Sequence, residues 1–289
     1  MIVVFGSINV DLIFPVTHLP APGETVLGGD YRIAPGGKGA NQALAARRAG
    51  SSVTMIGAVG RDEFAATALA LLRRDGVELG FIAACDRPTG CATIAVDPQG
   101  ENLIAVASGA NLVVVASQVP DRLLGSETTL VLQREISTRE NATLIERARA
   151  RGARIVLSLA PAGRIDPARV SDIDIIIANE GEAAALGIDV AREPRQALVV
   201  TRGAAGAITY LPEGGQIVVP SLPITPVDTT GAGDTFAGVL AAGLDQGLAL
   251  DAALRRASAA AALTCLAVGA QSAMPDRAAI DAAVERLTL

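Results

Sequence analysis

The sequence predicts an α/β fold with a mostly parallel central sheet, helices on both of its faces, and a small β-sheet lid. Three observations lead to this prediction. Short apolar runs alternate with helix-forming segments over most of the 289 residues. Half of the residues are hydrophobic and only 2% are aromatic, so a large core would consist of Ala, Val, Leu and Ile. Two β-rich stretches that contain Pro and Gly interrupt the alternation near the N-terminus.

The first half of the chain supplies the start of the sheet and the lid. Its predicted elements are a strand at 2–6, a helix at 39–49 ended by Gly50, a strand at 52–58, a helix at 63–74 ended by Gly76, and strands at 91–96 and 102–107 joined by a turn at 97–100. We expect one lid built from 12–33 and 91–107, inserted in an α/β domain formed by 1–11, 34–90 and 108–289.

The second half of the chain continues the alternation that defines a parallel sheet. Its predicted elements are strands at 129–133, 155–159, 173–178 and 197–201, helices at 138–151 and 180–186, a hairpin over 206–220, and helices at 232–246, 250–264 and 276–287. Strands of this kind are apolar throughout because helices cover both faces of the sheet.

Composition excludes several classes of protein. The net charge of −6, without a basic patch, argues against nucleic acid as a partner. No apolar run approaches the roughly 18 residues of a membrane span, and the opening residues carry no positively charged leader segment. Three cysteines without a Cys-x-x-Cys pair fit a reducing cytoplasm and argue against a zinc site. We therefore expect a cytoplasmic protein that acts on a small molecule.

The loop 226–236 is the most informative part of the chain. Gly231 and Gly233 free the backbone to bend, so successive N–H groups can face one concavity at the start of the helix 232–246. Such a helix N-terminus binds anions, above all phosphate. Asp234 stands beside it, where a carboxylate could take a proton from a hydroxyl nucleophile. The structural alternative is that Asp234 only caps the helix.

Further polar residues follow the carboxyl ends of the predicted strands, which is where open parallel sheets bind ligands. Each has a structural alternative as a turn former, a solvated residue or a helix cap. These residues are Asn9 and Asp11 after the first strand, Glu135 after the strand 129–133, Asn179 and Glu182 after the strand 173–178, and the glycine-rich loop 202–206 after the strand 197–201.

Lys38 is the one lysine in a chain with 23 arginines. It lies in the segment Pro35-Gly36-Gly37-Lys38-Gly39-Ala40-Asn41. A compact ammonium on a flexible stem has a different shape and hydration from a planar guanidinium. This position therefore favours a specific role for the ammonium, with chance retention in an arginine-rich chain as the alternative.

Motifs spread along the chain resemble those of the ribokinase-like (PfkB) carbohydrate kinases, and within that family the ribokinase branch. They occur in the family's order over nearly the whole length, and the two family signatures are both present. The motifs are Gly6-Ser7-Ile8-Asn9-Val10-Asp11, Pro22-Gly23-Glu24-Thr25-Val26, Gly36-Gly37-Lys38-Gly39-Ala40-Asn41-Gln42-Ala43, Asn179-Glu180-Gly181-Glu182 and Asp228-Thr229-Thr230-Gly231-Ala232-Gly233-Asp234-Thr235-Phe236.

The resemblance implies a catalytic and a sugar-binding set of residues. Asp234 would be the general base for the sugar hydroxyl, and the N–H groups of Gly231, Ala232 and Gly233 would form the anion hole for the transferring phosphoryl group. The positions implied to bind the sugar are Asn9, Asp11, Gly37, Lys38, Asn41, Glu135 and Asp234.

The resemblance also implies where ATP and metal ions would bind. The nucleotide positions are Asn179, Glu182, Thr201, Gly203, Ala204, Gly206, Gly233 and Ser258. Glu182 would place Mg²⁺ through water. A monovalent cation, K⁺, would be held by Asp228, Thr230, Thr264, Ala267 and Gly269. This chain departs from the family pattern at Ala273, where a serine ligand is usual, at Ser258, where a histidine is found, and at Leu159, where an asparagine is common.

The expected activity is ATP-dependent phosphorylation of D-ribose to ribose 5-phosphate by a homodimer formed through the lid. Three alternatives remain: a kinase for another pentose or a ketohexose, a nucleoside kinase with Phe14 or Phe81 against the base, and a non-catalytic sugar-binding protein on the same fold.

Overall fold

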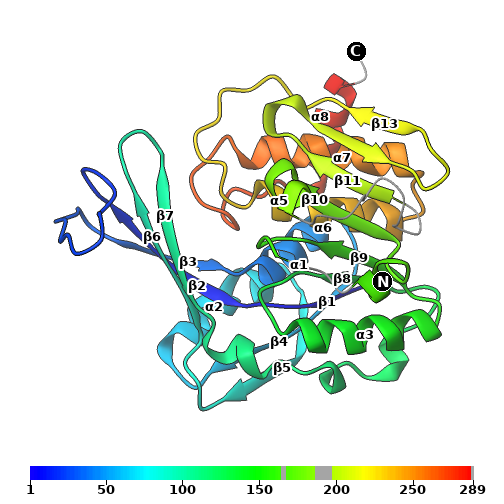
Figure 1. The fold of residues 1–289 in the computed structure, drawn as a ribbon, viewed down its shortest axis with the longest axis horizontal. Helices are drawn as coiled ribbons and strands as arrows, with labels where there is room; N and C mark the ends of the chain where they lie inside the picture. Colours follow the sequence, from blue (N-terminus) through cyan, green and yellow to red (C-terminus); the bar gives the residue numbers. More distant parts are fainter. Residues whose placement is uncertain (164–166, 186–196, 288–289) are drawn as a thin grey trace.

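A nine-stranded sheet forms the centre of the molecule (Figure 1). The computed structural model describes residues 1–163, 167–185 and 197–287. The strand order is β13-β12-β11-β10-β9-β8-β1-β4-β5, and only the pairs that involve β12 are antiparallel. The strands are β1 (Ile2–Phe5), β4 (Val53–Gly60), β5 (Glu78–Cys85), β8 (Thr129–Leu132), β9 (Arg154–Ser158), β10 (Ile175–Asn179), β11 (Ala197–Thr201), β12 (Ala207–Tyr210) and β13 (Gln216–Val219).

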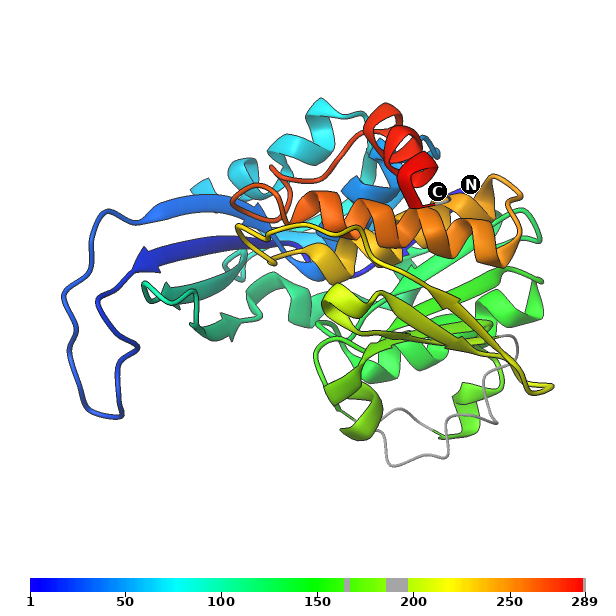
Figure 2. The same ribbon diagram turned by 90° about the horizontal axis from the view of Figure 1, so that it is seen from above.

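Helices cover both faces of this sheet. Those described are α1 (Lys38–Arg48), α2 (Glu63–Arg74), α3 (Thr138–Ala150), α4 (Pro167–Val170), α5 (Glu180–Ala185), α6 (Ala232–Asp245), α7 (Leu250–Thr264) and α8 (Arg277–Leu287). Figure 2 shows α7 and α8 on the opposite side of the sheet from α5. Alternate residues of β1 explain the two layers, because Ile2 and Val4 belong to one hydrophobic cluster while Val3 and Phe5 belong to another.

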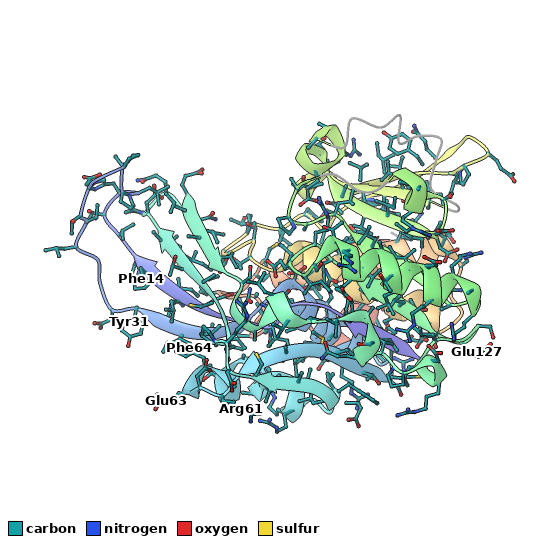
Figure 3. All side chains as sticks on the ribbon, turned by 60° about the horizontal axis from the view of Figure 1, so that its bottom comes forward. Phe14, Tyr31, Arg61, Glu63, Phe64 and Glu127 are labelled. Atoms are coloured by element: carbon teal, nitrogen blue, oxygen red, sulfur yellow. The ribbon has the colours of Figure 1, made fainter. Side chains whose placement is uncertain are left out.

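The small β-sheet forms a lid that extends away from the main sheet (Figures 1 and 2). Its order is β3-β2-β6-β7, from the strands β2 (Asn9–Pro15), β3 (Arg32–Gly36), β6 (Gly90–Val96) and β7 (Asn102–Ala107). Figure 3 shows Phe14 and Tyr31 together on the lid and Phe64 of α2 near its base. The rings of Phe14 and Tyr31 are 6.1 Å apart.

The fold class predicted from the sequence is confirmed, and the differences are local. The lid strands run past the predicted segments, since β2 begins at Asn9 and β3 ends at Gly36. Consequently Asn9 and Asp11 lie in the lid and not in the α/β domain. Strand β5 was not predicted, because as an edge strand it is half exposed and lacks a continuous apolar run. Residue 186 of the predicted helix 180–186 lies outside the described residues.

The topology brings the polar residues to one edge of the sheet. Strands β1, β8, β10 and β11 all run in the same direction, so their carboxyl ends meet at that edge. The lid is attached there too, because β2 starts four residues after β1 ends. Among the described residues, no helix is both long enough and apolar enough to cross a membrane.

Candidate active site

Asp234 lies in the first turn of α6, buried against α1. Its Oδ2 accepts a hydrogen bond of 2.9 Å from Asn41 Nδ2, and its Oδ1 accepts one of 3.0 Å from Gln42 Nε2. The residue in the N-cap position is Gly231, in the left-handed conformation with φ of +79°. Both carboxylate oxygens of Asp234 therefore face side chains of α1, which is not the arrangement of a helix cap.

The turn before Asp234 presents backbone N–H groups to the same region. The Ala232 N–H donates a 3.2 Å hydrogen bond to the Thr229 carbonyl, so this predicted member of the anion hole is engaged within the protein. Within the described residues, the N–H groups of Gly231 and Gly233 have no partner. The expectation of three amide donors is thereby corrected to two, because the tight turn uses one N–H to close itself.

A polar cavity of about 150 Å³ brings the acid, the ammonium and the glycine turn together. Its lining includes Lys38, Asp234, Gly231, Gly233 and Glu182. The charge of Asp234 raises the pKa of Lys38 more than burial lowers it, so the ammonium stays protonated. This cavity combines a cation, two free amide donors and a carboxylate, the set that a transferring phosphoryl group and a hydroxyl nucleophile require.

Burial raises the pKa of the Asp234 carboxyl above its ordinary value, while Lys38 and the hydrogen bonds from Asn41 and Gln42 oppose the shift. Asp11 is close enough to Asp234 and Lys38 for their charges to affect its pKa. Burial, reinforced by the charges of Glu135 and Asp234, raises the pKa of Asp11 from 3.8 to about 7. Asp11 and Asp234 thus hold their protons more tightly than a carboxyl group does in water.

The predicted sugar-binding residues come from β2, from α1 and from the segment after β8. Glu135 Oε2 accepts hydrogen bonds from Ser7 Oγ at 2.6 Å and from the Lys38 N–H at 3.0 Å. Gly37 has a φ of +88°, and a Cβ there would lie 2.7 Å from the Asn9 nitrogen. Glycine is therefore required at position 37 for α1 to begin so close to the lid strand.

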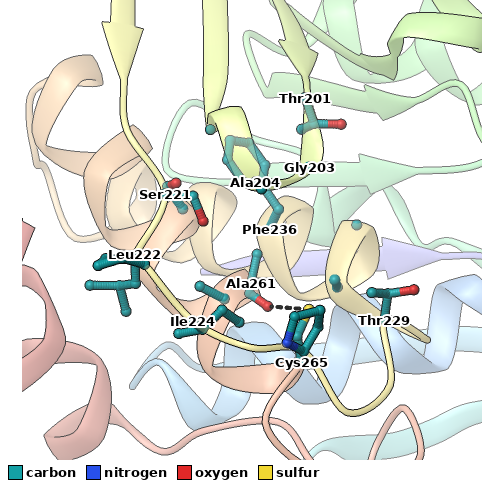
Figure 4. Close-up of a pocket in the computed structure, with 17 residues that line it drawn as sticks. Thr201, Gly203, Ala204, Ser221, Leu222, Ile224, Thr229, Phe236, Ala261 and Cys265 are labelled. Atoms are coloured by element: carbon teal, nitrogen blue, oxygen red, sulfur yellow. Dashed lines mark hydrogen bonds between the residues drawn. The ribbon is translucent and has the colours of Figure 1, made fainter.

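A second, larger cavity of about 360 Å³ lies beside the first (Figure 4). Six of the predicted nucleotide residues line it, namely Thr201, Gly203, Ala204, Gly206, Gly233 and Ser258. Thr201 and Gly233 line both cavities, so the two adjoin. The Ser258 hydroxyl donates to the Pro220 carbonyl at 2.7 Å, which turns it away from a donor role toward a ligand.

Asn179 and Glu182 line the polar cavity and also form the start of α5. Asn179 Oδ1 accepts from the Glu182 N–H at 2.7 Å, and Glu182 Oε2 accepts from the Asn179 N–H at 3.0 Å. These reciprocal bonds are a capping box. The structural alternative weighed for Asn179 is thus observed, and it leaves the second oxygen of Glu182 outside these two bonds.

Three of the predicted cation residues, Asp228, Thr230 and Gly269, are joined by hydrogen bonds. Asp228 Oδ1 accepts from the Thr230 N–H at 2.9 Å and Oδ2 accepts from the Gly269 N–H at 2.8 Å. Although burial alone would raise the pKa of Asp228, these hydrogen bonds lower it, so the carboxylate is ionised. In the part of the chain that the structure describes, the carbonyl oxygens of Thr264, Ala267 and Gly269 accept no hydrogen bond.

Sequence reasoning missed the side chains that position these groups. Gln42 and Gln271 belong to the network around Asp234, and Asn111 donates to Asn9 Oδ1 at 2.7 Å while it also bonds the backbone of Ile8. Gln42 stands next to Asn41 in a quoted motif, which was the one available signal. Asn111 and Gln271 lie outside the quoted motifs.

Comparisons with known proteins extend over nearly the whole chain. A model of the pfkB family of carbohydrate kinases matches residues 1–277. The chain belongs to this family. It is 34% identical to the ribokinase of Bacillus subtilis over 283 residues, covering 96% of each chain, and 36% identical to that of Haemophilus influenzae, covering 95% of each. A structure of Arabidopsis thaliana ribokinase complexed with ribose and ATP has a TM-score of 0.87 at 28% identity, covering 98% of each chain.

Membership of the pfkB family confirms the resemblance inferred from the motifs. It also confirms the predicted class of enzyme, an ATP-dependent phosphotransferase whose acceptor is a sugar hydroxyl.

Proposed function

We propose that this pfkB family kinase transfers the γ-phosphoryl group of ATP to the primary hydroxyl of D-ribose and releases ribose 5-phosphate. One observation carries the proposal: the Asp234 carboxylate, held by two amide donors, lies in a cavity with Lys38 and the free N–H groups of Gly231 and Gly233. The ribokinases to which the chain is similar over its full length support ribose as the sugar.

In this proposal the sugar lies between the lid strand β2 and the start of α1. Neutral sugar hydroxyls need partners that donate and accept, and Asn9, Asp11, Asn41 and Glu135 supply both kinds of group. Asp234 takes the proton of the primary hydroxyl as its oxygen attacks phosphorus. Lys38 and the two free amides then stabilise the negative charge of the transferring phosphoryl group.

ATP occupies the larger cavity, with its base against the apolar lining and its phosphates toward Gly233. Mg²⁺ fits next to Glu182, because an anionic oxygen facing the phosphates suits an ion that keeps most of its waters. Among the described residues, no group of three or more His, Cys, Asp or Glu side chains is arranged to hold a metal ion. Bound there, Mg²⁺ would neutralise charge on the β- and γ-phosphoryl groups.

K⁺ would bind beside Asp228, before the glycine turn. The ionised Asp228 and the three carbonyl oxygens of Thr264, Ala267 and Gly269 offer the hard oxygen ligands that an alkali cation needs. Ser272 does not replace the serine missing at position 273, because its hydroxyl donates to the Val268 carbonyl at 3.1 Å. We expect activation by K⁺ to remain, with one ligand fewer than in relatives.

The lid carries an apolar surface that fits a second copy of the chain. Its exposed residues include Leu27, Tyr31 and Ile33 beside β2 and Leu103, Ile104 and Val106 on β7. Several exposed apolar side chains on one small sheet favour an interaction site there. We therefore propose a homodimer in which each lid sheet packs on its partner.

A coupled assay of ADP release tests the function. Purified enzyme is given ATP, Mg²⁺ and K⁺ with D-ribose, 2-deoxyribose, other pentoses, fructose and a panel of nucleosides. We expect the highest kcat/KM with D-ribose. A higher value with a nucleoside or a ketohexose would assign a different substrate, and no turnover with any of them would leave a sugar-binding protein on a kinase fold.

A further inference from the structure

Gln271 is a buried side chain that is linked to the proposed catalytic base, Asp234, through the side chain of Asn41. It is 1% exposed and lies in the loop between α7 and α8, far from Asn41 in the sequence. Its Nε2 donates a 3.0 Å hydrogen bond to Asn41 Oδ1, and Asn41 Nδ2 donates to Asp234 Oδ2 at 2.9 Å. The three side chains thus form a continuous line of hydrogen bonds.

The direction of these bonds matters for the chemistry. An ionised carboxylate can only accept hydrogen bonds, so a base at Asp234 requires Asn41 to turn its NH₂ group toward it. The Asn41 carbonyl oxygen then faces the other way, into a buried region where it needs a donor. Gln271 supplies that donor. Without it, the Asn41 carbonyl oxygen would be buried without a donor, and the amide would no longer be fixed in the orientation that donates to Asp234.

Gln271 is itself held firmly by α1. Arg48 Nη1 donates to the Gln271 carbonyl at 2.7 Å and to the Met274 carbonyl at 2.8 Å. Arg48 is fixed in turn by Asp75, whose Oδ2 lies 2.7 Å from Arg48 Nε. Asn41 and Arg48 are seven residues apart, two turns along the same face of α1. One face of this helix therefore binds both the backbone and the side chain of Gln271.

We propose that Gln271 is a positioning residue for phosphoryl transfer, which fixes the amide of Asn41 and through it the carboxylate of Asp234. This inference rests on the proposed function of Asp234 as the base. Gln271 lines neither of the two cavities, so it acts without touching sugar or nucleotide. Its loop also contains Gly269, which bonds Asp228, so the order of that loop and the orientation of the base are linked.

The test is a double-mutant cycle with Gln271→Leu, Asn41→Ala and the double variant. We expect Gln271→Leu to lower kcat by about 10- to 100-fold, because a small misplacement of a catalytic group costs that much. The KM for ATP should stay within about twofold, since Gln271 lines no cavity. In the Asn41→Ala background the same substitution should change kcat by less than about twofold, because the side chain that links Gln271 to Asp234 is absent.

Gln246→Leu is the matched control. Gln246 Nε2 donates to the Ala49 carbonyl at 3.1 Å and to Ser51 Oγ at 3.2 Å, so it bonds the far end of α1 through the same group. Its loss should leave kcat within about twofold of wild type, as expected of a surface side chain away from the site. If Gln271→Leu fails to fold, Gln271→Asn keeps the amide but is one methylene too short, and its kcat should fall in the same way.

Two outcomes overturn this role, and they are distinct from failure of the proposed function. A normal kcat in both Gln271 variants removes Gln271 from the line of positioning groups. Equal losses with and without Asn41 show that Gln271 only supports the loop. Absence of sugar-dependent turnover in the wild-type enzyme overturns the proposed function, and the role of Gln271 with it.

Discussion

The two adjoining cavities differ in what would hold a ligand. The larger one is lined mainly by apolar side chains, among them Ile224, Ala261 and Phe236 (Figure 4). The smaller one has charged groups at its centre, Lys38, Glu182 and Asp234. Apolar contact depends on area and tolerates small changes in shape. A buried cluster of charges depends on each partner, because an unpaired charge is costly.

This contrast predicts how each cavity responds to substitution. Changes in the polar cavity should alter the chemical step, protonation or sugar binding, whereas changes in the apolar cavity should alter only the KM for ATP. The hydrogen bonds around Asp234 come from α1, which also carries Lys38, so a single helix organises the polar cavity.

The largest effect is expected for Asp234→Asn. The amide keeps the size of the side chain but cannot accept a proton, so kcat should fall by at least about 10²-fold. Ribose binding, measured by isothermal titration calorimetry, should persist because the other sugar-binding groups are unchanged. Asp245→Asn, at the other end of α6, is the control and should retain wild-type kcat. Near-normal turnover of Asp234→Asn would show that Asp234 is not the base, and the polar cavity would then not differ from the apolar one in carrying the chemical step.

The next effect concerns the stability of the ligand-free protein. The pKa of Asp11 is raised to about 7 in the folded state from 3.8, so the folded state binds the proton more tightly than the unfolded state. Stability from this group is therefore present at low pH and is lost as pH rises toward 7, by on the order of a few kcal/mol.

Asp11→Asn isolates this pH-dependent contribution to stability, because the variant has no proton to lose at this position. Urea unfolding of both proteins at pH 5 and pH 8 measures the difference in their free energies of unfolding. We expect the free energy of unfolding of Asp11→Asn, relative to that of wild type, to increase from pH 5 to pH 8. Parallel pH dependences of the two proteins would show that the surroundings of Asp11 are more open to water than its burial indicates.

The sequence predicts the residues whose chemistry depends on local spacing, but not the hydrogen bonds between distant segments. Asp234, Lys38 and the glycine turn were found because their chemistry depends on residue type and short spacing, which a sequence displays directly. The bonds from Gln42, Asn111 and Gln271 join groups about 100 to 230 residues apart, and no local pattern encodes such a pairing.

Two expectations from the sequence were wrong, one about the anion hole and one about the lid boundary, and both have local causes. The N–H of Ala232 was expected in the anion hole, but the turn at Thr229 uses it, which depends on backbone angles and not on residue type. Asn9 and Asp11 were placed in the α/β domain because the prolines, glycines and short apolar runs that indicate the lid begin at residue 12. The chain in fact enters the lid within a few residues, so a composition change is a poor marker of where a sheet begins.

A smaller effect is expected for Lys38→Arg. The planar guanidinium is larger than an ammonium and cannot fit the same space among the carboxylates that act on Lys38, so the KM for ribose should rise by about fivefold. Arg74→Lys is the converse control at an exposed position and should change no kinetic constant. An unchanged KM in Lys38→Arg would mean that the polar cavity tolerates a change of cation shape, and that it resembles the apolar cavity more than its charges suggest.

The smallest effect is expected in the larger cavity, for Ile224→Ala. Ile224 is half-buried and contributes to the apolar lining, so shortening it removes part of the surface that would cover the base of ATP. A loss of about 1 kcal/mol of apolar contact should raise the KM for ATP by about fivefold. The kcat and the KM for ribose should not change, and Val218→Ala on the exposed side of β13 should leave all three constants as they are. A fall in kcat with an unchanged KM for ATP would mean that this wall aligns the phosphates, and that the apolar cavity contributes to the chemical step as the polar one does.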